Sequence, residues 1–132
     1  MEPDDVAAGL LDASLPQSEW THAGHVAAAH ALIRSHGHAR ALELLRTSIP
    51  RLNDAHGVPN TDDDGYHETL TVFFAAAVAD AASRGLSAGE TATAVPSAAP
   101  LVWWTRETLF SPAARHAWVP PDRGTPPFAL LP

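Results

Sequence analysis

The chain has 132 residues, 45% of them hydrophobic and 17% charged, which is the composition of one globular domain with a single core. Its formal net charge of -7 argues against nucleic acid or an anionic membrane as a partner, because both attract basic surfaces. There is no cysteine, which excludes disulfides, thiolate catalysis and cysteine-ligated zinc, and leaves His, Asp and Glu to hold any metal ion.

Helix signals recur along the first 95 residues, separated by proline and glycine stop signals. Four helices and a weaker fifth are predicted, over residues 3–13, 19–36, 38–56, 65–83 and 86–95. Ser18 is the expected N-cap of the second helix and Gly37 its stop. Pro50 should kink or end the regular part of the third helix.

Beyond Pro100 the pattern changes to short helical pieces and an extended, proline-rich tail. This segment carries most of the large aromatic side chains: Trp103, Trp104, Phe110, Trp118 and Phe128. We expect these rings to pack back onto the helical core; the alternative is an interface in a homodimer. No stretch alternates with a period of two. The sequence therefore predicts one all-α domain over 1–132, a small helical bundle (1–100) closed by an aromatic and proline-rich segment (101–132).

Two features of the chain bear on its location. The first residues, MEPDDVAAGLL, are acidic and lack the basic-then-apolar order of a signal peptide. The longest apolar run, at 72–82, contains Asp80 and is too short to span a bilayer. We therefore expect a soluble cytoplasmic protein.

Histidines stand near the starts of two predicted helices. At about 100° per residue, His22 and His25 lie one turn apart at the start of the apolar stripe of the second helix. His67 shares the apolar face of the fourth helix with Phe74, and Glu68 lies about 100° away at the edge of that face. These four polar side chains are therefore expected on or beside the core faces of their helices.

Helix topology should bring these side chains together. Short connections favour antiparallel neighbours, so the N-terminal ends of the second and fourth helices should lie at one end of the bundle. The third helix should end there too, with Asn53 and His56 nearby. The sequence therefore predicts a site at this end of the bundle.

Three imidazoles beside a carboxylate are typical of a catalytic metal site with an open position for water or substrate. We predict that His22, His25 and His67 hold one divalent ion, with zinc favoured and iron, manganese or nickel as alternatives. Glu68 would be a fourth ligand or a general base. Thr71 stands where the H-E-x-x-H protease motif requires a second histidine, which weakens a protease interpretation. The alternative is a metal-free cluster of hydrogen-bonded polar groups.

Other polar and aromatic residues receive simpler interpretations. The run 62–64 should cap the fourth helix rather than bind metal. Glu19 and His22 form one Glu-x-x-His pair, and with no second pair a di-iron centre is not expected. Trp20 and Tyr66 are expected to pack, with a pocket wall and an acid as the respective alternatives. The histidines expected at surface or partly buried positions are His30, His36, His38 and His116.

Three segments carry a resemblance to a known family: WTHAGH at 20–25, RLNDAHGVPNTDDDGYHETLT at 51–71 and SPAARHAWVPPD at 111–122. The chain resembles a largely uncharacterised family of small all-helical bacterial proteins. They share a T-H-x-x-H element, a G-Y-H-E-T or K-Y-H-E-T element and a Trp-containing, Pro-rich C-terminal end. The resemblance implies a helical fold and shared polar positions at His22, His25, His67 and Glu68, but no particular reaction.

We therefore expect a small metal-dependent enzyme acting on a small organic molecule, of hydrolase or lyase/isomerase type, with Glu68 as the proton-transfer group. The alternative is a non-catalytic helical module that binds a ligand or a protein partner, with a metal-free buried network of histidine and glutamate. A pH-responsive interaction protein is a third interpretation of the eight histidines.

Overall fold

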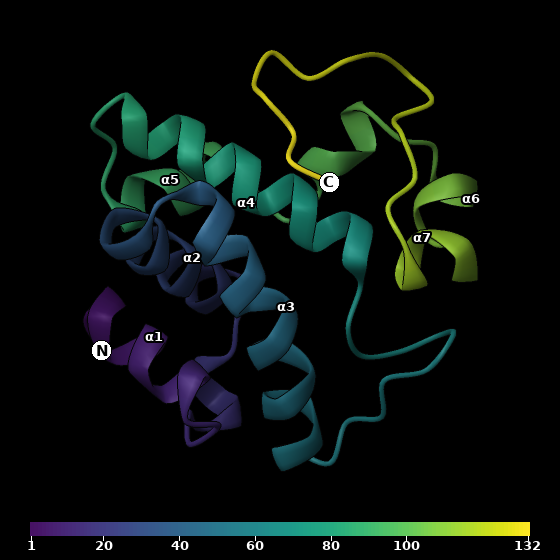
Figure 1. Ribbon diagram of the computed structural model, residues 1–132. Coiled ribbons are helices and arrows are strands. Elements are labelled where there is room, and N and C mark those ends of the chain that lie inside the picture. Colours follow the sequence, from purple (N-terminus) through teal and green to yellow (C-terminus); the bar gives the residue numbers. More distant parts are fainter.

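The computed structural model describes residues 1–132 and contains helices but no strand, which confirms the predicted all-α class (Figure 1). The helices are α1 (Pro3–Leu11), α2 (His22–His36), α3 (His38–Ala55), α4 (Glu68–Ser83), α5 (Ala88–Ala94), α6 (Arg106–Leu109) and α7 (Pro112–His116). Two 3-10 turns, Gln17–Glu19 and Ala99–Val102, join them. None of these helices is both long enough and apolar enough to cross a membrane.

Helices α2, α3 and α4 pack against one another, α1 covers α2 and α3, and α5 packs on α2 and α4. The main core between them is built from fully buried aliphatic side chains such as Leu10, Val26 and Leu52. Small residues, among them Ala28 of α2 and Ala75 of α4, let the helix axes approach closely. This arrangement places the start of α2, the end of α3 and the start of α4 around one region.

A second, aromatic core joins the C-terminal segment to α4. The buried ring of Trp104 meets Phe73 edge-on at 5.6 Å between centroids and Trp118 at 5.7 Å. Phe128, in the tail, also lies 5.7 Å from Phe73. The indole Nε1–H of Trp104 donates to the carbonyl of Val119 at 3.1 Å, so this buried polar group has its partner.

Two helix starts differ from the prediction, because side chains closer to the helices supply the caps. Helix α2 begins at His22 rather than after Ser18, since the Thr21 hydroxyl accepts the Gly24 N–H at 3.1 Å. Helix α4 begins at Glu68, and its N-cap is His67, whose Nδ1 accepts the Leu70 N–H at 3.1 Å. The prediction that the aspartates at 62–64 cap this helix was therefore wrong; they lie in the preceding loop.

Pro50 lies inside α3 and does not end it. A proline within a helix removes one amide donor. The following turn still buries Leu52 and Asn53, and this packing carries the helix on to Ala55. The continuation matters for the site, because Asn53 belongs to this last turn.

Candidate functional site

A pocket of about 480 Å³ opens between the N-terminal part of α2, the C-terminal half of α3 and the N-terminal half of α4. Of the 20 residues that line it, 11 are hydrophobic. The polar or aromatic residues that the sequence had singled out and that line it are Trp20, His22, His25, Asn53, Asp64, Tyr66, His67, Thr71 and Phe74. Glu68 and His56 lie outside the lining, and His56 Nε2–H donates to the Leu15 carbonyl at 2.7 Å.

His22 is held in one orientation by a carbonyl and an aromatic ring. Its Nε2 lies 2.8 Å from the carbonyl oxygen of Val95, just after α5. Since a carbonyl only accepts, Nε2 carries the proton, and Nδ1 of the neutral ring keeps its lone pair. The ring also meets Phe74 of α4 edge-on at 5.5 Å. His22 therefore presents a fixed tautomer at the pocket.

His25 lines the pocket on the first turn of α2, where part of its side chain is exposed to solvent and its ring is covered by neighbouring groups. Its Nδ1–H donates to the Thr21 carbonyl at 2.7 Å, and its ring stacks on Trp20 with 3.7 Å between centroids. Burial of the ring by these neighbours lowers the pKa of His25. The hydrogen bond to the Thr21 carbonyl acts in the opposite direction, and a charge on His22 lowers the pKa further. Nε2 of the neutral ring remains an acceptor.

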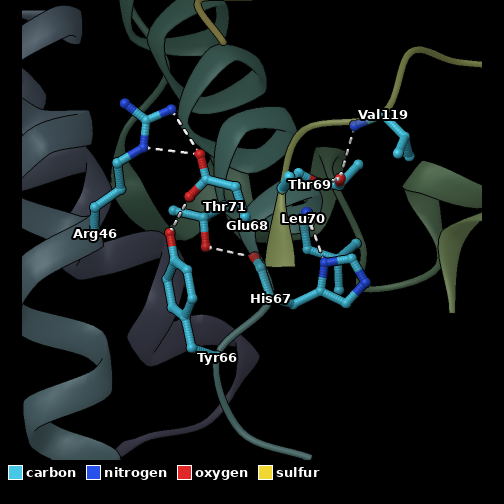
Figure 2. Close-up of polar contacts among 9 residues, drawn as sticks. Arg46, Tyr66, His67, Glu68, Thr69, Leu70, Thr71 and Val119 are labelled. Atoms are coloured by element: carbon cyan, nitrogen blue, oxygen red, sulfur yellow. Dashed lines mark hydrogen bonds and ion pairs between the residues drawn. The ribbon is translucent and has the colours of Figure 1, made fainter. Parts of the chain in front are cut away.

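His67 uses both ring nitrogens within the protein, and Figure 2 shows the bond that Nδ1 accepts from the Leu70 N–H. While Nδ1 caps α4, Nε2–H donates to the carbonyl of Leu109, at the end of α6, at 2.6 Å. The side chain is only 6% exposed. Burial and the nearby charge of Arg115 lower the pKa of His67, whereas the hydrogen bond to the Leu109 carbonyl raises it. The net shift is downward, so the ring is neutral at pH 7. His67 thus fastens the start of α4 to the C-terminal segment.

Glu68 faces α3 rather than the pocket, in a network with Arg46 and Tyr66 (Figure 2). Its Oε2 accepts from Arg46 Nε at 2.9 Å and Nη2 at 2.7 Å, and its Oε1 accepts from the Tyr66 hydroxyl at 2.6 Å. Burial, and then this bond to a carboxylate, raise the pKa of Tyr66, so the phenol stays protonated. The network holds Tyr66 as part of the pocket wall.

Two arginines that support the site were missed by sequence reasoning. Arg46 bonds Glu68 across 22 residues of sequence, and Arg115 of α7 donates from Nη1 to the Gly65 carbonyl at 3.0 Å. Arg115 therefore anchors the loop that carries Tyr66. Neither contact has a local sequence signal, because each partner lies on a different helix or loop.

The structure contains no group of three or more His, Asp or Glu side chains placed to hold a metal ion. His22 and His25 each keep one ring nitrogen without a protein partner, but His67 keeps none. A metal ligand set of these three histidines would require His67 to give up one of its backbone hydrogen bonds. That set stays a prediction.

His30 differs from the expectation of a surface or partly buried position. It is 5% exposed, and its Nε2 lies 2.8 Å from the Leu86 carbonyl, just before α5. The segment just before α5 covers the face of α2 that carries His30. The sequence of α2 alone gives no signal that another segment packs there. His36 and His116 are exposed, as expected, and His38 is half-buried.

The chain was also compared with family models, curated proteins and solved structures, and none of them matches it. The resemblance of its WTHAGH and GYHET elements to a bacterial family therefore stays a prediction. What can be concluded about function follows from the geometry of the pocket itself.

Proposed function

We propose that the protein binds a small organic molecule in the pocket between α2, α3 and α4. The observation that carries this proposal is a cavity of about 480 Å³ with a mostly apolar lining and a few polar groups at defined positions. Ligand sites in proteins commonly occupy about 300–1,000 Å³ and have this mixture of walls and polar anchors. A small aromatic or alkyl compound fits these dimensions.

The polar residues of the site support binding more directly than catalysis. His67 is committed to Leu70 and Leu109, and Glu68 is neutralised by Arg46. Both groups stabilise the walls of the pocket and are not poised to move protons. The function favoured here is therefore the ligand-binding module with a metal-free histidine and glutamate network.

Ligand-observed NMR and calorimetry with a panel of aryl-alkyl compounds test this proposal. Each skeleton is present as an amine, an alcohol and a carboxylic acid. Saturable binding is expected in the wild type and should be lost in Ala29→Leu, which adds volume to the pocket wall. Ala39→Leu, at an exposed position of α3, is the matched control.

Because Ala29 is buried, Ser97→Phe at the exposed rim of the pocket serves as a second blocking variant that leaves the core unchanged. Circular dichroism checks the fold of each variant. If no compound binds the wild type, or if binding persists unchanged in both blocking variants, the pocket is not a ligand site.

A metal-dependent enzyme is the second candidate, and one observation favours it. His22 and His25 each donate one ring N–H to a carbonyl and leave the other nitrogen open, which is how proteins orient imidazole ligands of metals. A divalent ion, zinc first, would supply Lewis-acid chemistry or an activated water for a hydrolase or a lyase/isomerase. In this candidate Glu68 is released from Arg46 to transfer a proton.

Elemental analysis of untagged protein separates the two candidates. Near-stoichiometric zinc, iron, manganese or nickel that is lost in a helical His22→Ala/His67→Ala double variant would support the enzyme. No retained metal, even after reconstitution with each of these ions, would rule it out. His36→Ala, at an exposed position of α2, is the control for adventitious binding.

A further inference from the structure

The pocket carries no cationic side chain. None of the eight arginines of this lysine-free chain is among its lining residues, whereas Asp64 is; this carboxylate is exposed, and its Oδ1 accepts the Gly65 N–H at 2.8 Å. The protein as a whole has a formal net charge of -7. An anionic ligand group would therefore find no counter-charge in the pocket, and the surrounding potential would oppose its entry.

The fixed polar groups of the pocket are hydrogen-bond acceptors. His22 and His25 have both spent their N–H groups on carbonyls, so the neutral rings offer only lone pairs. The Tyr66 hydroxyl has spent its proton on Glu68, so its oxygen is also an acceptor. All three side chains therefore act as hydrogen-bond acceptors toward a ligand, because their N–H and O–H groups already donate to other groups of the protein.

The remaining polar groups change this balance little. Asn53 donates one amide N–H to Asn60 at 3.1 Å and is left with its side-chain oxygen and one N–H. The Thr71 hydroxyl donates to the His67 carbonyl at 2.8 Å and so adds an acceptor, whereas the Thr21 oxygen accepts the Gly24 N–H and keeps its proton, and the Ser97 hydroxyl can take either role. At the start of α4, the N–H groups that the His67 cap leaves open belong to Glu68 and Thr69, which do not line the pocket.

We infer that the ligand of this pocket is a small protonated primary or secondary amine with an apolar body, an inference that rests on the proposed function. The ammonium N–H groups match the acceptors on His22, His25 and Tyr66, and Asp64 supplies the opposite charge. Trp20, which has one face covered by His25, and Phe74 also line the pocket, and aromatic rings favour a neighbouring cation. Apolar walls from all three helices accommodate the body of the molecule.

The test compares four probes of one skeleton by calorimetry at about pH 8, where imidazoles of ordinary pKa are neutral. They are 2-phenylethylammonium, its N-trimethyl derivative, 2-phenylethanol and 3-phenylpropanoate. The first has a positive charge and N–H donors, the second has the charge alone, the third is neutral and the fourth is an anion. We expect 2-phenylethylammonium to bind at least about tenfold more tightly than 3-phenylpropanoate, and more tightly than the other two.

Asp64→Asn should weaken binding of the amine several-fold and leave the affinity for 2-phenylethanol unchanged. Asp63→Asn, one residue away and outside the lining, is the matched control and should change neither affinity. Equal or tighter binding of 3-phenylpropanoate that is blocked in Ser97→Phe would overturn the inference and leave the proposed function intact. Binding of the N-trimethyl derivative as tight as that of the amine would also overturn the inference, because that derivative has no N–H donor, and would leave the proposed function intact. If no member of the panel binds, the proposed function itself fails.

Discussion

His67→Ala should lower the free energy of unfolding by about 2–4 kcal/mol. The substitution removes the N-cap acceptor of Leu70, a loss that commonly costs about 1 kcal/mol. It also leaves the carbonyl of Leu109 without a donor, and a buried unsatisfied group costs about 1–3 kcal/mol. Both losses follow from hydrogen bonds that already exist within the protein, without any bound metal.

Urea unfolding followed by circular dichroism measures this change, and two variants serve as controls. His67→Asn can still cap α4, since asparagine is among the best N-cap residues, but it is too short to reach Leu109. It should therefore recover about 1 kcal/mol of the loss. His116→Ala, at an exposed position, should change stability by less than about 0.5 kcal/mol. A loss of under about 0.5 kcal/mol for His67→Ala would refute the structural role assigned to His67.

Three further predictions concern packing, charge and pH. Gly24→Ala should cost at least about 2 kcal/mol of unfolding free energy, since a Cβ there would lie 2.2 Å from the Glu19 carbonyl oxygen. Gly89→Ala, in open space on α5, should instead stabilise by about 0.5–1 kcal/mol; equal effects in urea melts would contradict this contrast. A double-mutant cycle of Arg46→Met and Glu68→Gln should give a coupling of about 1 kcal/mol, and additive effects would show that the pair does not act as a unit. Finally, because the pKa of His67 is lowered in the folded state, the unfolded chain binds more protons than the folded chain below about pH 6.5. The free energy of unfolding should therefore fall as pH falls through that value, by up to about 1.4 kcal/mol per pH unit for this proton. Unfolding curves between about pH 7.5 and 5 should show a steeper loss in the wild type than in His67→Asn, and parallel losses would count against the lowered pKa.

The helices themselves were predictable because their signals are local. Apolar residues recur with the helical period, and glycine or proline marks most of the ends, so α1 and α3 begin where the sequence indicates. The sequence also predicted that the starts of α2 and α4 lie near each other, from the expectation that successive helices run antiparallel, and residues from both starts do line one pocket. The N-caps were predicted wrongly: Thr21 caps α2 instead of Ser18, and His67 caps α4 instead of the aspartates at 62–64.

The role of each polar side chain was decided only by the tertiary structure. His22 bonds a carbonyl 73 residues away and His67 one 42 residues away, while Glu68 turns to Arg46 of another helix. The sequence by itself determined that polar groups gather at one end of a helical bundle. Which of their atoms remain available to a ligand depends on partners that are distant in sequence, because each ring nitrogen or carboxylate oxygen takes the donor or acceptor that packing brings within about 3 Å.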